Sequence, residues 1–249
     1  MEPASFQIIL VIFLKLLMAH LAADFLLQPK SWIRDRKRKK YKSGYLYLHV
    51  LVVVILTWLF LAEPAEWQIP FFIGVTHLFI DIWKSYRPDN FVAFLADQFA
   101  HIMILVIATA FYANANLEFE SLMIIEIDSL YFWSLLTAFF LVTYPSAYFV
   151  SAATGRWRKE MNNVISEDPN PGLDSAGKWI GIVERILILL FIIMNQFGAV
   201  GFLIAAKSVF RFGSISNPDD QMRAEYILIG TLISFALAIA TGVLVTLVT

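Results

Sequence analysis

The sequence predicts an all-α protein, a polytopic transmembrane helical bundle of about eight segments. Of its 249 residues, 59% are hydrophobic and only 16% are charged, and the mean hydropathy is +0.69. This balance lies outside the range of ordinary soluble domains. Apolar stretches of roughly 18 residues or more, the length that a helix needs to cross a membrane, recur along the chain. Cysteine is absent, which excludes disulfides and thiolate metal sites.

The apolar stretches give the expected helices in chain order. They cover about residues 5–28, 44–61, 69–83, 91–113, 130–152, 178–196, 197–212 and 226–249. The longest polar stretch, 154–177, contains Pro169, Pro171 and Gly172 and is typical of a loop. We therefore expect an N-terminal membrane bundle over residues 1–153, a cytoplasmic loop over 154–177 and C-terminal membrane helices over 178–249.

Two further features belong to the C-terminal helices. Gly198 and Gly201 lie where two apolar segments meet, which indicates a tight helical hairpin or a broken helix. Glu184 is expected to pair with Lys207 or Arg211 near the cytoplasmic surface. In one interpretation this pair only stabilises the structure, and in the other it binds substrate.

The distribution of lysine and arginine predicts the orientation in the membrane. Four polar regions, at residues 30–42, 84–87, 156–178 and 207–223, hold 17 of the 19 Lys and Arg residues. With eight spans these regions all fall on one side, and the loops on the other side contain acidic residues and no Lys or Arg. Because cytoplasmic loops carry the excess of positive charge, we expect an integral protein of the bacterial inner membrane with cytoplasmic basic loops and both termini periplasmic.

The basic stretch from Lys30 to Lys42 has two compatible interpretations. It is a topogenic signal, or it binds anionic lipid head groups or a phosphorylated substrate at the membrane surface. Only Trp32 and Tyr41 interrupt it as aromatic residues. It is also short, so nucleic-acid binding is not expected.

Histidine and aspartate recur in pairs within the apolar segments. The four histidines all lie in the first 101 residues, and three of them have an aspartate four residues away. The pairs are His20 with Asp24, His77 with Asp81, and Asp97 with His101, and the fourth histidine is His49. Residues four apart project from the same face of a helix, so each pair can hold one ion.

The expected topology places these residues at a common depth. At roughly 1.5 Å of rise per residue, each lies within about 15 Å of the cytoplasmic end of its helix. Buried carboxylates repel one another unless a cation is present. Nitrogen and oxygen donors without sulfur fit zinc, with manganese or iron as alternatives. The predicted ligands of one or two divalent metals are His20, Asp24, His49, His77, Asp81, Asp97 and His101.

Several roles remain open for this cluster. A hydrogen-bonded structural network and a proton relay are the alternatives to metal binding. Asp97 is the candidate catalytic residue, as a general base instead of a ligand. Gln28, Lys84 and Gln98 lie beside the cluster and are candidates for orienting ligands or holding an anionic substrate. The alternatives are snorkelling of Lys84 to the interface and capping of a helix end by Gln28.

The same motifs resemble a known family. His20-Leu-Ala-Ala-Asp24-Phe-Leu-Leu-Gln28, Thr76-His77-Leu-Phe-Ile-Asp81 and Asp97-Gln98 followed by His101 resemble the bacterial membrane family called domain of unknown function 3307. The resemblance covers roughly the first 110 residues. Residues 181–185 and 205–208 are similar to longer members. The family implies no activity.

The pattern favours a membrane-embedded, metal-dependent hydrolase. Its site is expected to open to the cytoplasmic leaflet and to act on a lipid-linked or membrane-tethered phosphoester, ester or peptide. One alternative is a divalent-cation or proton-coupled transporter, although such proteins usually hold their substrate near the bilayer midplane and contain repeats. Another alternative is a non-catalytic membrane scaffold or sensor.

Overall fold

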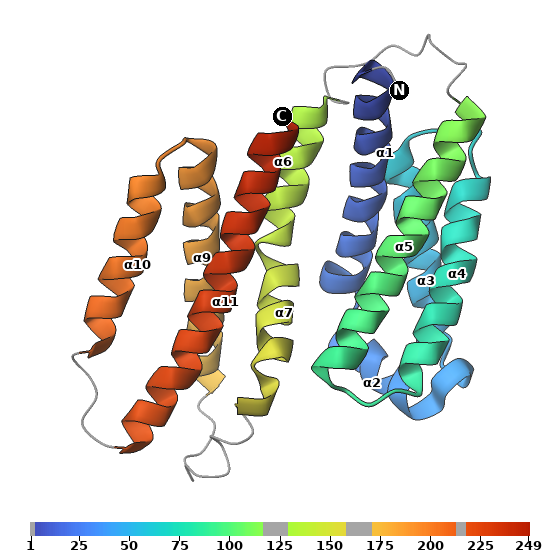
Figure 1. Ribbon diagram of the computed structural model, residues 1–249. Coiled ribbons are helices and arrows are strands. Elements are labelled where there is room, and N and C mark those ends of the chain that lie inside the picture. Colours follow the sequence, from blue (N-terminus) through green and yellow to red (C-terminus); the bar gives the residue numbers. More distant parts are fainter. Residues whose placement is uncertain (1–2, 117–128, 158–170, 213–217) are drawn as a thin grey trace. The chain divides into compact units, whose positions relative to one another are not determined.

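The computed structural model describes residues 3–116, 129–157, 171–212 and 218–249 (Figure 1). All regular secondary structure in these ranges is helical, as the composition predicts, and they contain no strand. The chain divides into two compact units, Met1–Thr137 and Ala138–Thr249. This division falls within helix α6 (Leu130–Leu141), before the polar stretch 154–177 at which the sequence suggests a boundary.

Fewer helices than the expected eight segments have the length and apolar composition of a membrane span. Four qualify within the described residues: Phe6–Leu26, Gly44–Leu61, Phe91–Ala113 and Glu225–Val248. A fifth is added if the bent pair Leu130–Leu141 and Tyr144–Ala153 counts as one span. Helix α4 (Gln68–Ser85) is 18 residues long, but its histidine, aspartate and lysine make it too polar to qualify. Eight spans are therefore not confirmed.

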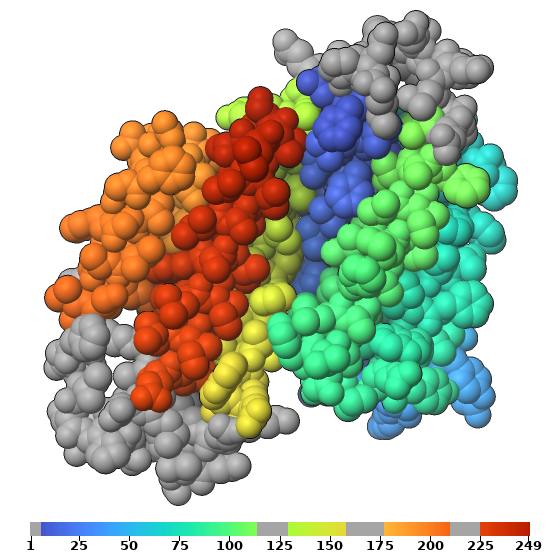
Figure 2. Space-filling view, in the orientation of Figure 1, coloured from blue at the N-terminus to red at the C-terminus, as the bar shows by residue number. Residues whose placement is uncertain are grey.

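Unit 1 is built on four helices that each contact two neighbours. They are α1 (Pro3–Leu21), α3 (Gly44–Leu61), α4 and α5 (Phe91–Asn116), and the contacts join α1 to α3, α3 to α4, α4 to α5 and α5 back to α1 (Figure 1). In Figure 2 the side chains of α1 and α5 form one continuous surface. Large aromatic rings such as Phe79, Phe99 and Phe111 remain exposed on the outside, as expected for a surface that faces lipid.

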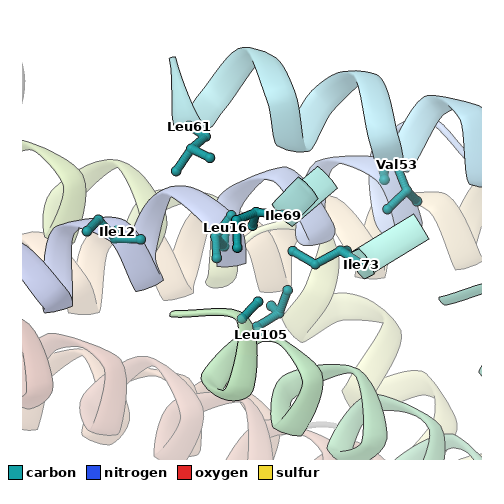
Figure 3. Packing of buried hydrophobic residues seen from close by; sticks show 9 residues of the cluster. Ile12, Leu16, Val53, Leu61, Ile69, Ile73 and Leu105 are labelled. Atoms are coloured by element: carbon teal, nitrogen blue, oxygen red, sulfur yellow. The ribbon is translucent and has the colours of Figure 1, made fainter. Parts of the chain in front are cut away.

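The inside of this four-helix unit is an apolar core that continues into the polar cluster. Ile12, Leu16, Val53, Leu61, Ile69, Ile73 and Leu105 converge from the four helices (Figure 3). The apolar residues and the cluster residues share the same helix faces. On α4, Ile69, Ile73 and His77 follow one another at intervals of four residues, and Asp81 completes the series. The packing of the core therefore also determines where the histidines and aspartates point.

Gly74 allows α3 and α4 to approach closely above the cluster. A Cβ atom at this position would collide with Cγ2 of Val54. A side chain here would displace either Val54 or the two helices. Since α3 carries His49 and α4 carries His77, this close packing holds the two imidazoles near one another.

Two segments differ from the expected elements before α3. Helix α1 does not continue as an α-helix to residue 28 but passes into a π-helix, η1 (Ala22–Leu26), in which the Leu27 N–H donates to the Ala22 carbonyl at 3.0 Å. The basic stretch is not a loop. It forms helix α2 (Lys30–Lys39) and a 3₁₀-helix, η2 (Lys40–Lys42), because Lys and Arg favour helix and Pro29 suits a helix start.

Unit 2 contains helices α7 (Tyr144–Ala153), α9 (Pro171–Ile193), α10 (Phe197–Phe212) and α11 (Pro218–Val248). The expected continuous helix over 130–152 is broken, since α6 and α7 meet at 41°. Pro145 lies in the first turn of α7 and cannot donate a hydrogen bond to the preceding turn.

Helices α9 and α10 form a hairpin (Figure 1). Of the two expected arrangements, a hairpin or a broken helix, the structure has the hairpin. The turn is made by Asn195, whose φ of 57° is left-handed, and by the Gln196 N–H, which donates to the Phe191 carbonyl at 2.7 Å. Gly198 and Gly201 are not turn residues but lie inside α10. Asparagine tolerates this backbone conformation better than most side chains.

Candidate metal centre

Four helices of unit 1 supply the polar cluster from neighbouring ends. His20 is in the last turn of α1 and Asp24 in the π-helix that follows, and His49 lies near the start of α3. His77 and Asp81 occupy the second half of α4, and Asp97 and His101 the first half of α5. Because successive helices run in opposite directions, these positions meet at the end of the unit next to α2 (Figure 1).

Asp24 is surrounded by histidines from three helices. Its Oδ1 atom lies 3.3 Å from His49 Nε2, 3.6 Å from His77 Nε2 and 3.8 Å from His20 Nδ1. The π-helix is the local feature behind this position. π-helical turns re-aim side chains and frequently occur at functional sites.

Six of the seven predicted ligands form three groups with the spacing that a metal ion needs. The groups are His20, Asp24 and His101; Asp24, His49 and His77; and His77, Asp81 and His101. Within each group one nitrogen or oxygen atom per residue lies within 4.8 Å of the others. Asp24, His77 and His101 each belong to two groups, so the groups are continuous. The structure leaves Asp97 outside all three.

Unsatisfied ligand atoms indicate that the residues fit a cation. His20 Nε2, Asp24 Oδ1, His49 Nδ1 and His101 Nε2 are buried without a hydrogen-bond partner in the described structure, whereas Asp81 Oδ2 is already paired with Arg36. Buried polar atoms are normally hydrogen-bonded, because an unpaired one costs about 1–3 kcal/mol. A divalent ion bound to these lone pairs would remove that cost. The donors are imidazole and carboxylate, which suit zinc, manganese and iron.

The ring of His101 is oriented by the backbone. Its Nδ1 lies 3.0 Å from the Asp97 carbonyl oxygen, and since a carbonyl only accepts, Nδ1 carries the proton. The lone pair is then on Nε2, which is one of the unsatisfied buried atoms. Hydrogen bonding of the second ring nitrogen is the usual way in which proteins hold a metal-binding histidine.

His49 and His77 face each other with their Nε2 atoms 3.0 Å apart. Both side chains are almost fully buried, with 1% and 2% of their surface exposed. Each Nε2 also lies 3.7 Å from Asp81 Oδ2. Two imidazole nitrogens at this distance share either one proton or one cation, so the pair suits both a metal site and a proton relay.

Arg36 is a member of the cluster that the sequence interpretation missed. It reaches from α2 to form an ion pair with Asp81 and is buried, although most basic residues around it are exposed. In the sequence Arg36 is one of eight basic residues in a run expected to be a loop. The helical register of residues 30–39 is the only signal that separates it from its neighbours.

Lys84 and Gln98 both contact Asp97. Lys84 Nζ lies 2.8 Å from Asp97 Oδ2, and the Gln98 amide donates to the same oxygen at 3.1 Å. Lys84 also donates to the Ala93 carbonyl at 3.4 Å. Both contacts hold the carboxylate of Asp97, and the expected role in orienting ligands or binding an anion stays a prediction. Gln28 is half-buried and lies two residues after the end of the π-helix.

Polar contacts to the region around the end of α4 and to the start of α3 anchor helix α2 beside the cluster. Lys37 pairs with Asp89 at 2.7 Å, which ties α2 to the turn after α4, and Lys40 of η2 donates to the Ser85 carbonyl at the end of α4 at 2.5 Å. Asp35 accepts a hydrogen bond from Ser43 at 2.7 Å. The hydrogen bonds from Lys39 and Ser43 hold the pKa of the Asp35 carboxyl below its usual value.

Three charged residues of unit 2 have partners within that unit: Glu184, Arg185 and Lys207. Lys207 and Glu184 form the expected pair at 2.5 Å, and the side chain of Arg211 lies outside the described residues. Arg185 is buried and donates to the Val142 carbonyl at 2.5 Å, to Ser234 Oγ at 2.9 Å and to the Thr143 carbonyl at 3.2 Å. It therefore satisfies the carbonyl groups freed by the break between α6 and α7.

Residues 12–129 match the model of a family described as Protein of unknown function (DUF3307). The matched range contains all seven predicted metal ligands, and the match confirms the resemblance inferred from the His/Asp motifs. The segments at 181–185 and 205–208 lie outside it. No curated protein and no solved structure matches the chain.

Proposed function

We propose that this protein is a membrane-embedded, metal-dependent hydrolase that acts on a lipid-linked or membrane-tethered substrate. The observation that carries the proposal is the convergence of four histidines and two aspartates from four helices into three overlapping ligand groups. Ionisable residues inside apolar helices are expensive and are functional candidates by default. A purely structural network would normally leave fewer buried atoms without a partner.

The proposed reaction needs little beyond an ion, a water molecule and a proton acceptor. His20, Asp24, His49, His77, Asp81 and His101 would hold one or two ions, zinc being the first choice with manganese or iron as alternatives. A divalent ion bound there lowers the pKa of a coordinated water and polarises the bond to be cleaved. Hydrolysis adds the water's OH to the acyl or phosphoryl atom and its remaining proton to the leaving group.

Asp97 is the proposed general base. Its Oδ2 is engaged by Lys84 and Gln98, whereas its buried Oδ1 has no hydrogen-bond partner within the described residues. A fixed carboxylate with one free oxygen can accept a proton from water and pass it on to the leaving group. Its position outside the three ligand groups leaves it free for this role.

The proposed site opens to the cytoplasmic leaflet of the bacterial inner membrane. Support comes from α2 and η2, which lie at the same end of unit 1 as the cluster. Their exposed basic residues are Lys30, Arg34, Arg38, Lys39 and Lys42. An exposed basic helix next to apolar helices suits anionic lipid head groups and the cytoplasmic side. A lipid-linked substrate would reach the cluster from this end.

Metal-dependent turnover tests the proposal. The purified protein is stripped with a chelator, reloaded with zinc, manganese or iron, and offered fluorogenic phosphoester, ester and peptide substrates in lipid micelles. We expect hydrolysis of one class only after reloading, with loss in Asp97→Asn and no change in the control Glu66→Gln, which lies in the turn between α3 and α4. Absence of turnover in all three classes by fully loaded protein would contradict the proposal.

A divalent-cation or proton-coupled transporter is the second candidate. The observation in its favour is the span broken between α6 and α7, with buried Arg185 at the break, since transporters commonly use discontinuous helices. Reconstitution into liposomes that enclose a zinc-sensitive or pH-sensitive dye separates the two candidates. A hydrolase leaves the dye signal unchanged, and a transporter changes it.

A further inference from the structure

We propose that Arg36 and Lys84 form a phosphate-binding pair at the edge of the metal cluster, so that the substrate is a phosphate ester and not a carboxylic ester or a peptide. The inference rests on the proposed function, because the pair acts on a substrate held at the loaded cluster. It adds a substrate class and one residue, Arg36, that neither the ligand groups nor the His/Asp motifs include.

Arg36 has the burial and the donors of an anion-binding residue. Only 7% of its surface is exposed, and its guanidinium forms an ion pair with Asp81. Its Nε is nevertheless buried without a hydrogen-bond partner in the described structure. A guanidinium has five N–H donors in a planar fork that matches a phosphate group, and one carboxylate does not use them all.

Lys84 lies on the same face of α4 as the partner of Arg36. Asp81 and Lys84 are three residues apart on this helix, and side chains at that spacing are neighbours. The ammonium of Lys84 is 2.8 Å from Asp97 Oδ2, and only 14% of its side chain is exposed. The cluster is thus flanked by two largely buried cations, each set against one carboxylate.

The charge balance favours an anionic substrate. Asp24, Asp81 and Asp97 contribute three negative charges, and Arg36 and Lys84 contribute two positive charges, which gives a formal charge of −1 with neutral histidines. One divalent ion changes this sum to +1, and two change it to +3. Uncompensated charge is expensive in a buried site. A phosphate ester brings one or two negative charges, whereas a carboxylic ester or a peptide bond brings none.

The competing interpretation is that the two cations only neutralise Asp81 and Asp97. In that case Arg36 and Lys84 would matter for folding or metal affinity and not for anion binding. The two readings differ in a measurement on metal-loaded protein, in which metal content and phosphate affinity are determined separately.

The test is calorimetric titration of zinc-loaded full-length protein in detergent, after removal of unbound zinc. The probes are inorganic phosphate, the soluble lipid dihexanoyl phosphatidic acid, and acetate as the control anion. We expect phosphate-type probes to bind and acetate not to bind. Arg36→Gln and Lys84→Gln should each weaken phosphate binding at least tenfold. Arg87→Gln, which removes an exposed arginine from the turn after α4, should leave it unchanged.

The remaining outcomes are distinguishable. Arg36→Lys keeps the positive charge but loses the planar fork of the guanidinium. Its phosphate affinity should therefore lie between those of the wild type and Arg36→Gln. This variant replaces Arg36→Gln in the test if the glutamine variant does not fold. Tighter binding of the lipid than of inorganic phosphate assigns the phosphate to a lipid, and equal binding assigns it to a soluble ester. If Arg36→Gln and Lys84→Gln retain zinc and bind phosphate with wild-type affinity, the phosphate-binding pair is overturned but the proposed function is not. Absence of stoichiometric zinc in the wild type overturns the proposed function first.

Discussion

Asp24 is the residue on which the geometry of the cluster depends most. Its Oδ1 lies 3.3 Å, 3.6 Å and 3.8 Å from nitrogen atoms of His49, His77 and His20, and it belongs to two of the three ligand groups. Asp97 is the useful contrast, since it belongs to none and is held by Lys84 instead. The two carboxylates therefore make different predictions for the same substitution.

We expect Asp24→Asn to lower zinc affinity at least tenfold and Asp97→Asn to change it much less. The asparagine keeps the shape of each side chain but removes the charge that attracts the cation, and a tenfold loss corresponds to about 1.4 kcal/mol. Competition against a chelating dye measures both affinities on the same preparation. Equal losses in the two variants would show that Asp97 is a ligand of the same rank.

The sequence predicted the histidines and aspartates of the cluster but not the charged residues that contact them. The spacing of four residues in His77 and Asp81 defines a shared helix face whatever the tertiary structure, so the pairs were predictable. The ion pair of Arg36 with Asp81 was not, because it joins two helices and depends on the rotation of α2 about its axis. The exclusion of Asp97 from the ligand groups likewise follows from its contact with Lys84.

Helix α2 lies outside the four packed helices but contributes Arg36 to the cluster. Asp35 holds it to the start of α3 through Ser43, and because the pKa of Asp35 lies below its usual value of 3.8, this contact is present at neutral pH. The pKa is lowered because the ionised carboxylate, and not the protonated form, accepts the hydrogen bond. The contact is lost only when the pH falls through that lowered pKa.

Asp35→Ala should therefore loosen α2 and speed its cleavage by trypsin severalfold at neutral pH. The lysines and arginines between Lys30 and Lys42 supply the cleavage sites, and loss of the Ser43 and Lys39 contacts exposes them through local opening. Mass spectrometry of the first fragments gives the rate at this segment. Glu66→Ala, in the turn between α3 and α4, is the matched control and should cleave like the wild type. Identical rates in Asp35→Ala and wild type would mean that other contacts hold the helix.

Arg185 joins helices in unit 2, as Asp35 joins α2 to α3 in unit 1. It bonds two carbonyl groups at the break between α6 and α7 and the hydroxyl of Ser234 on α11. Arg185→Met should destabilise the protein by about 2 kcal/mol, because buried carbonyls lose a charged donor. Thermal unfolding in detergent measures the change, with Arg185→Lys expected to lose less. A melting temperature unchanged in Arg185→Met would contradict this role.

The helices were predictable where apolar length and turn chemistry agree. The bounds of Gly44–Leu61 and Phe197–Phe212 match the expected ranges. The prediction failed where one apolar run contains two elements, as at Pro145, and where a polar run is helical, as in α2. Hydropathy indicates which segments are buried in lipid or protein. It does not locate a bend within an apolar stretch, and it does not detect a polar helix.

The number and direction of membrane crossings is a property of the whole molecule. Eight spans, or the four that qualify by length and apolar composition, place both termini on the same side, and five place them on opposite sides. From the distribution of Lys and Arg we expect both to be periplasmic. Alkaline phosphatase fused at either terminus should be active and green fluorescent protein should be dark. Fluorescence from one terminus only would favour five spans, and fluorescence from both would reverse the orientation.

The most direct measurement is elemental analysis of the purified protein, with the wild type beside His77→Ala and the control Thr76→Ala. His77 belongs to two ligand groups, whereas the neighbouring Thr76 bonds only to backbone carbonyls of its own helix. We predict about one or two zinc, manganese or iron atoms per chain in the wild type and in Thr76→Ala, and their loss in His77→Ala. Equal metal content in His77→Ala, or no metal in any of the three proteins after reloading, would contradict a metal centre formed by these four helices.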